Sequence, residues 1–142
     1  NGIGWSPDNN TMYVTDSGKQ TIWAFDFDQE NLGITNRRIF TKDENYYPDG
    51  LTVDSEGCVW SAKWDGFCII KYSPLGNIEA KIKLPIQRPT SLIFGGSKLN
   101  KLYITSASYG IKNQDTNSIN GSVLEIITDT KGFTAQSPNI FN

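Results

Sequence analysis

Histidine is absent from this 142-residue sequence, which also has only two cysteines. Ser-His-Asp and Cys-His nucleophile systems need an imidazole to take the proton of the nucleophile, so neither can be assembled from this chain. The common zinc sites combine histidine with cysteine or carboxylates and are disfavoured for the same reason. A hydrolase built from these residues would instead need carboxylates and a metal ion.

Long apolar runs and blocks of like charge are also lacking. No stretch of 18 apolar residues occurs, so no membrane-spanning helix is predicted. The 13 basic and 15 acidic residues are mixed along the chain, and the formal net charge is −2. No basic stripe favours nucleic acid or an anionic membrane. Small neutral or acidic molecules are the ligands that this composition allows.

The cysteines predict a reducing environment. Cys58 and Cys68 flank a turn at Asp65-Gly66, and a hairpin there places Cys68 opposite Lys63 and Cys58 opposite Ser73. The two cysteines are then roughly 17 Å apart along the ladder, whereas a disulfide needs Cα atoms within about 7 Å. We expect free thiols. The first residues show no secretory signal either, so a cytoplasmic protein is expected.

One pattern occurs three times: a small polar pair, an alternating apolar run, a turn and an aromatic-bearing strand. The copies are NGIGWSPDNNTMYVTDS, DGLTVDSEGCVWSAKW and TSLIFGGSKLNKLYITSA, whose matched aromatics Tyr13, Trp60 and Tyr103 lie 47 and 43 residues apart. A period of about 40 to 50 residues with several short strands per copy is typical of β-propeller blades. No stretch of ten or more residues keeps an apolar 3.6 period, so no helix is expected.

The predicted fold class is therefore all-β, with about three four-stranded blades at residues 1–43, 44–86 and 87–142. Residues 107–120 form a polar loop without strand periodicity. The expected strands are 3–5, 12–15, 21–27 and 37–41, then 51–53, 59–63, 68–72 and 78–83, and finally 91–94, 101–106, 122–127 and 133–141.

Three blades cannot close a ring, because propellers have about four to eight. The open lateral faces would expose sheet surface, which natural proteins avoid. Either more of the same polypeptide or a second copy of this chain should complete the ring.

The residues that begin each innermost strand form one set of candidate site residues. Asn1, Asp49 and Thr90 all carry oxygen and should face one another across the central channel. Amide and carboxylate oxygens suit calcium, magnesium or manganese, although two such side chains are too few for a complete site. The alternative is that Asn-Gly and Asp-Gly are ordinary turn dipeptides, but their recurrence at the same register favours a site.

A second set lies where the second strand of each blade returns to the channel mouth, at Asp16, Lys63 and Ser106. These residues are either substrate contacts or solvated loop positions, and Asp16 and Lys63 could also form an inter-blade ion pair. Tryptophans in such repeats are more often packing residues than ligand platforms. Trp64, beside a loop at the mouth, is the exception that we include in a substrate pocket.

The quoted repeats, together with RPTSLIFGG, resemble the C-terminal half of the regucalcin, gluconolactonase and luciferin-regenerating enzyme family, also called the senescence marker protein family. The resemblance covers nearly the whole chain and includes the Asn-Gly and Pro-Asp-Gly motifs in order. It implies a six-bladed propeller with one divalent metal ion in the channel, most often calcium, with zinc, magnesium or manganese possible, that hydrolyses lactones, often sugar lactones.

The resemblance also implies roles for individual residues. The family holds its metal with an early glutamate, the asparagine of Asn-Gly and the aspartate of Pro-Asp-Gly, and Asn1 and Asp49 match the last two. Asp49 is then both metal ligand and candidate general base, and Thr90 or Ser91 would line the pocket. The glutamate and the family's upstream substrate-binding arginine and asparagine have no counterpart in this sequence.

Two other functions fit part of the pattern. A non-catalytic calcium-binding or regulatory propeller of the same family would use the same two ligands. An interaction scaffold of the WD type is suggested by Trp64-Asp65 and the repeat length, but only one Trp-Asp pair occurs and the Gly-His motif is missing. If the protein is a lactone hydrolase, its expected substrate is a small-molecule lactone.

Overall fold

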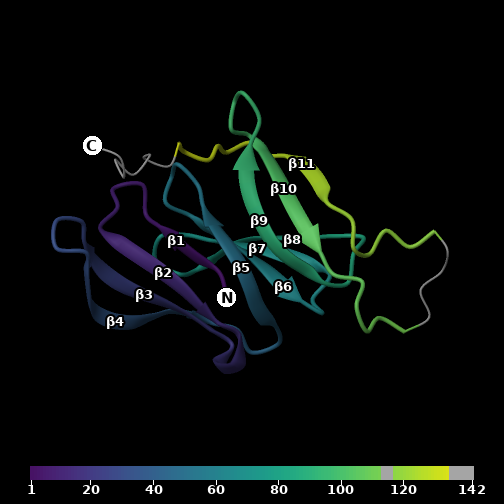
Figure 1. Cartoon of the computed structure of the whole chain (residues 1–142), viewed down its shortest axis with the longest axis horizontal. Coiled ribbons are helices and arrows are strands. Elements are labelled where there is room, and N and C mark those ends of the chain that lie inside the picture. The colour runs from purple at the N-terminus through teal and green to yellow at the C-terminus, as the bar shows by residue number, and fades with distance from the viewer. Residues whose placement is uncertain (113–116, 135–142) are drawn as a thin grey trace.

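The computed structural model describes residues 1–112 and 117–134 and is built of antiparallel sheets (Figure 1). Eleven strands fall into three sheets within these residues, and the single helical element there is a 3₁₀ turn, η1 (Ser17–Lys19). The all-β class and the separation into blade-like units are as predicted. No helix in the described part is long and apolar enough to cross a membrane.

The first sheet contains β1 (Ile3–Trp5), β2 (Thr11–Asp16), β3 (Thr21–Asp28) and β4 (Gly33–Lys42), in that order. Strand β4 is longer than the predicted 37–41 because it continues around two irregularities in its pairing with β3. The turn after β2 is η1, whose N-terminal cap is the Asp16 side chain accepting from the Lys19 backbone N–H.

The middle sheet contains β5 (Tyr47–Val53), β6 (Val59–Trp64), β7 (Cys68–Tyr72) and β8 (Ile78–Lys83). Strand β5 begins earlier than the predicted 51–53, so Asp49 lies inside the strand. The pairing with β6 shifts register between Pro48 and Leu51, and Asp49 and Gly50 sit at that irregularity. Irregularities of this kind re-aim side chains beside functional sites.

The third sheet contains β9 (Pro89–Gly95), β10 (Lys101–Ser106) and β11 (Leu124–Ile127), with β10 in the centre. Strand β11 is shorter than the predicted 122–127. The expected outer strand at 133–141 falls almost wholly outside the described residues, and the described positions 133 and 134 carry no strand.

Apolar side chains between neighbouring sheets form two cores. Tyr13, Ile22 and Ala24 of the first sheet pack against residues of the middle sheet such as Val59 and Ile70. The other face of the middle sheet packs against the third sheet, and this core contains Trp60, Ala62, Ile69, Leu92, Phe94, Leu102 and Ile104. Alternate residues of β6 and β7 enter opposite cores. Most residues of these two strands are therefore apolar, on both faces of the sheet.

The innermost strands of the three sheets lie side by side, β5 contacting both β1 and β9. The chain begins in the middle of the molecule beside β5, whereas β4 lies at its outer edge (Figure 1). The Gly2 N–H donates to the Asp49 carbonyl at 3.2 Å. A Cβ on Gly2 would lie 2.8 Å from that oxygen, and one on Gly50 would lie 2.6 Å from the Ser91 Cα. Neither glycine has a positive φ, so the motif glycines permit close packing of strands rather than a turn.

Both cysteines are free, as expected, and both are buried. Cys68 pairs with Lys63 in the β6–β7 ladder, which is the predicted register. Apolar residues are exposed on the outward faces of the first and third sheets, where Ile39 is 59% and Ile93 65% accessible.

Candidate functional site

A pocket of about 500 Å³ opens where β5 begins and where β2 and β6 end. Its lining residues come from both the first and the middle sheet, and they are Asn1, Ser17, Gly18, Tyr47, Asp49 and Trp64. Asn1, Asp49 and Trp64 were expected to share a site, and the tertiary structure brings these three together.

A hydrogen-bond relay holds Asn1 at the pocket. Its side-chain nitrogen donates to the Ser17 hydroxyl at 2.6 Å, and that hydroxyl donates to the Pro48 carbonyl at 2.5 Å. The relay therefore ties the first residue to the strand that carries Asp49. Within residues 1–112 and 117–134, no donor engages the Asn1 side-chain oxygen, so this oxygen is available to a cation or substrate.

Asp49 is half-buried, and burial raises the pKa of its carboxyl group. The Gly50 backbone N–H acts in the opposite direction. No side chain in the described part of the chain donates to this carboxylate. Desolvation makes the charged form costly unless a cation or donor compensates it, so the position suits a metal ligand or a proton acceptor.

Tyr47 is a pocket residue that sequence reasoning missed. It pairs directly with Trp64 across β5 and β6, and both residues line the pocket. Its place two positions before Asp49, in the Tyr-Pro-Asp-Gly motif, was the available signal, because alternate residues of a strand share a face. Ser17 was also missed, although it follows the candidate Asp16.

Asp16 has a structural role beside the pocket. Its carboxylate caps η1 and forms an ion pair with Lys19 at 3.2 Å. The cap holds Ser17 and Gly18 at the pocket wall, while Asp16 itself is not among the lining residues. The ion pair with Lys63 that we considered does not form.

Lys63 lies at the expected strand end, but its side chain enters the core between the first and middle sheets. Its ammonium is completely buried, 2.7 Å from the Asp43 carboxylate and 3.1 Å from the Ser61 hydroxyl. The Tyr72 hydroxyl donates to the same carboxylate at 2.8 Å. Burial lowers the pKa of Lys63, and Asp43 opposes that effect. This lysine is engaged in packing the blades and does not line the pocket.

The other candidates belong to the third sheet and are not among the residues that line the pocket. The Thr90 and Thr105 hydroxyls are 2.8 Å apart, and Ser91 packs against Gly50. The Ser106 hydroxyl donates to the Ser122 carbonyl at 2.7 Å and accepts from the Gly121 N–H. Ser106 thus fastens the loop that follows β10.

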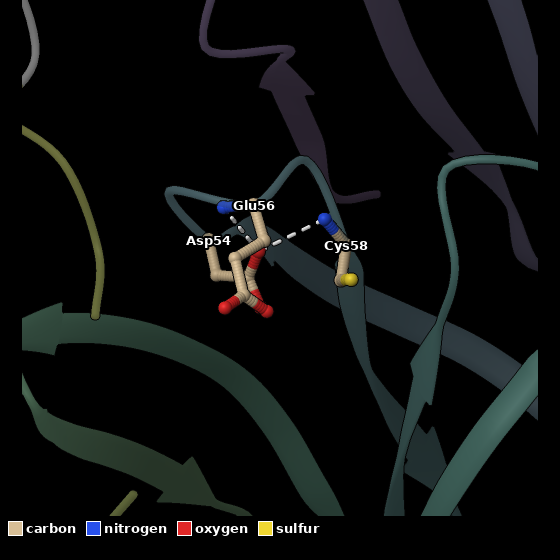
Figure 2. A group of neighbouring side chains, drawn as sticks. All are labelled: Asp54, Glu56 and Cys58. Carbon is tan, nitrogen blue, oxygen red and sulfur yellow. Dashed lines mark hydrogen bonds between the residues drawn. The ribbon is translucent and has the colours of Figure 1, made fainter. Parts of the chain in front are cut away.

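A group of possible metal ligands lies elsewhere, in the β5–β6 turn (Figure 2). Oxygen and sulfur atoms of Asp54, Glu56 and Cys58 lie within 4.8 Å of one another. Figure 2 shows the Glu56 and Cys58 backbone N–H groups donating to Asp54, at 3.0 and 2.9 Å. The other Asp54 oxygen accepts from Trp60 Nε1 at 2.9 Å.

A lysine ammonium also compensates the negative charges of the carboxylates in and beside this turn. The Lys71 ammonium lies 3.6 Å from Asp54, 3.7 Å from Glu56 and 3.2 Å from Glu79. The Asp54 lone pairs and charge are thus satisfied by the protein itself, and the group organises a turn and anchors a buried tryptophan. The pocket at Asn1 and Asp49, which lacks such compensation, is the better candidate site.

Comparisons with known proteins identify one family. Residues 1–108 match the family described as the SMP-30/Gluconolactonase/LRE-like region. The chain is 35% identical over 109 residues to the pentonolactonase XacC of Haloferax volcanii, covering 75% of this chain and 38% of XacC. It is 38% identical over 117 residues to regucalcin of Gallus gallus, covering 80% of this chain and 39% of that protein.

A solved structure described as a calcium-binding protein, regucalcin, from Agrobacterium tumefaciens superposes with a TM-score of 0.86. It is 26% identical and the match covers 94% of this chain and 47% of that one. The predicted propeller fold is confirmed by this similarity. The chain spans 38% and 39% of the length of the two curated relatives. It belongs to the SMP-30/gluconolactonase/LRE-like family.

Proposed function

We propose that the intact protein is a metal-dependent hydrolase that opens lactone rings, and that this chain supplies part of its site. The observation that carries the proposal is the convergence of Asn1 and Asp49 on one pocket from two different sheets. The similarity to a pentonolactonase supports a lactone as the small-molecule substrate.

The residues present fit a divalent ion. An amide oxygen and a half-buried carboxylate are hard ligands, and calcium is the first candidate, ahead of magnesium, manganese or zinc. Calcium is also supported by the regucalcin relative described as calcium-binding. When bound, such an ion would polarise a lactone carbonyl and lower the pKa of an attacking water.

Asp49 has two tasks in this mechanism. Its carboxylate would help to hold the ion, and it would position the attacking water or accept its proton. Asn1 is neutral and would bind without cancelling the positive charge of the ion. The Ser17 relay keeps the Asn1 amide nitrogen occupied, which leaves its oxygen to bind the ion.

The remaining ligands would come from additional blades. We propose that the chain forms the C-terminal half of a six-bladed propeller with blades at about 1–43, 44–86 and 87–142. The exposed Ile39 and Ile93 lie on the outward faces against which further blades would pack. Either more of the polypeptide or a second copy of the chain would cover these faces.

We propose that the protein is cytoplasmic. Two buried free thiols are expected in a reducing compartment and would be unusual in a secreted protein of this kind.

The test is lactone hydrolysis by the full-length protein with added calcium and after chelation. Asp49→Asn keeps the shape of the side chain but removes the charge, and it should lower kcat/KM at least a hundredfold and weaken calcium binding. Asp28→Asn, at the exposed end of β3, is the matched control and should leave both unchanged. Unchanged turnover in Asp49→Asn would remove Asp49 from the mechanism.

A calcium-binding or regulatory role without catalysis is the second candidate, because the same two ligands and the same relative support it. Calcium binding that depends on Asp49, combined with no hydrolysis of any lactone tested, would favour this alternative.

A further inference from the structure

We propose that Tyr47 and Trp64 form an aromatic wall that binds the C–H face of a sugar-lactone ring, and that Arg88 is a positioning residue for Trp64. The proposal rests on the lactonase function above and assigns substrate-contacting and positioning residues at the same pocket.

The wall lies directly beside the candidate ligands. Tyr47 and Trp64 are opposite each other across β5 and β6, and they line the pocket together with Asn1 and Asp49. Tyr47 is 53% accessible although its ring is large and apolar. Two aromatic rings next to an amide and a carboxylate make a pocket with one apolar side and one polar side.

A hydroxylated lactone ring has the matching chemistry. One face of such a ring presents C–H bonds, which pack well on an aromatic surface, while its edge presents hydroxyl and carbonyl oxygens. Stacking on the wall would leave that polar edge facing Asn1 and Asp49. A ring without hydroxyls would keep the stacking and lose the polar contacts.

Arg88 holds the indole of Trp64. Its guanidinium carbon lies 4.8 Å from the centre of the Trp64 ring, within the range of a cation–π contact. Arg88 is itself fixed by a two-pronged contact with Asp65, at 2.6 and 3.3 Å. The hydrogen bond from Arg88 lowers the pKa of Asp65, so the pair stays charged at neutral pH. Only 15% of the arginine side chain is accessible.

Arg88 also connects the wall to the loop that follows β10. Its guanidinium donates to the Tyr109 carbonyl, and its own carbonyl accepts from the Ala107 N–H at 3.0 Å. Gln87 adds a hydrogen bond to Asp65 at 2.8 Å. These contacts hold Trp64 in one orientation before substrate arrives, which reduces the entropy lost on binding.

The test uses full-length protein loaded with calcium and compares glucono-δ-lactone with δ-valerolactone, which has the same ring without hydroxyls. Trp64→Leu and Arg88→Met should each raise KM for glucono-δ-lactone about tenfold with kcat little changed. Arg88→Lys keeps the charge without the planar fork and should fall between Arg88→Met and the unchanged protein. The unchanged protein should prefer glucono-δ-lactone.

Arg37→Met is the matched control, because Arg37 stacks on Trp23 at 4.9 Å in the first sheet, away from the pocket. Its KM should equal that of the unchanged protein. Binding of gluconolactam, a ring analogue that resists hydrolysis, is the second readout and is followed by tryptophan fluorescence. Trp64→Phe and Tyr47→Leu provide further variants if Trp64→Leu fails to fold.

The outcomes separate the two proposals. Hydrolysis with an unchanged KM in the Trp64 and Arg88 variants overturns the wall and leaves the lactonase intact. Lactam binding that is lost in Trp64→Leu, without hydrolysis by the unchanged protein, supports the wall and overturns the lactonase. No binding of the lactam to the unchanged protein overturns the wall, and a preference for δ-valerolactone overturns the placement of the hydroxylated edge at Asn1 and Asp49.

Discussion

Gly50 of β5 packs directly against Ser91 of β9, so that a Cβ at position 50 would lie 2.6 Å from both the Cα and the Cβ of Ser91. Real Cβ atoms do not approach other atoms so closely, and the innermost strands of the middle and third sheets can meet here only because position 50 has no side chain. This contact holds the strand segment that presents the neighbouring Asp49 to the pocket.

Replacing Gly50 with alanine should therefore move two strands apart. We expect Gly50→Ala to reduce the free energy of unfolding by about 1–3 kcal/mol, because backbone and a short side chain cannot yield as a long side chain can. Urea unfolding of the full-length protein measures the change. Gly33→Ala is the control, since nothing lies within 4 Å of a Cβ there. Equal losses in the two variants would contradict the close packing.

Lys63→Met should destabilise the protein by about 3–5 kcal/mol, because it leaves the Asp43 charge buried without its cation. Adding Asp43→Asn to Lys63→Met should recover part of that loss. The free energy of unfolding of the double variant, compared with the sum of the two single changes, measures the coupling of the pair. Lys101→Met removes the exposed pair with Glu125 and should cost less than about 1 kcal/mol. Thermal unfolding of Lys63→Met, Asp43→Asn, the double variant and Lys101→Met gives the comparison, and a Lys63→Met protein as stable as Lys101→Met would refute the buried pair.

The Cys58 thiol should make stability depend on alkaline pH. Burial, together with the nearby Asp54 charge, raises the pKa of Cys58 from 9.0 to about 11. The folded state then keeps a proton that the unfolded state loses, so the contribution is full below pH 9.0 and disappears as the pH rises toward 11.

Urea unfolding between pH 7 and 10.5 would show this effect as a stability advantage over Cys58→Ala that shrinks above pH 9.0. Iodoacetamide should also leave Cys58 and Cys68 unlabelled in the folded protein at pH 8, as peptide mass spectrometry would show. A constant advantage across the pH range would mean that the thiol titrates normally.

Asp54→Asn should lower stability without changing calcium affinity. An amide at this position can place a donor, rather than an acceptor, against Trp60 Nε1, and a buried donor without a partner costs about 1–3 kcal/mol. Asp49→Asn should have the opposite pattern, with weaker calcium binding and a small effect on stability. Isothermal titration calorimetry and thermal unfolding distinguish the two, and a loss of calcium affinity in Asp54→Asn would identify the turn of Figure 2 as the calcium site.

Local patterns accounted for the strands, because they depend on neighbours in the chain. The alternation in 59–63 and 68–72 and the turn at Asp65-Gly66 were sufficient for the β6–β7 register, including the pairing of Lys63 with Cys68. Repetition along the chain similarly predicted that Asn1 and Asp49 begin equivalent strands. Both residues line the pocket.

Contacts between blades could not be predicted in the same way. Lys63 was expected at the channel mouth, but the side of β6 on which it lies is buried by the first sheet, where Asp43 receives it. Tyr47 became a pocket residue because β5 begins before its apolar alternation does. The role of Arg88 depends on three loops that meet only after the blades have packed.

The sequence by itself determined the all-β class, the blade repeat, the free thiols and the two oxygen-bearing residues of the candidate metal site, since these follow from residue type, spacing and strand periodicity. Only the tertiary structure decided which polar groups are buried, which are paired, and which aromatic rings stand beside Asp49. The physical reason is that desolvation and ion pairing depend on the atoms that another blade brings within a few ångströms, and no local pattern in the chain encodes that neighbour.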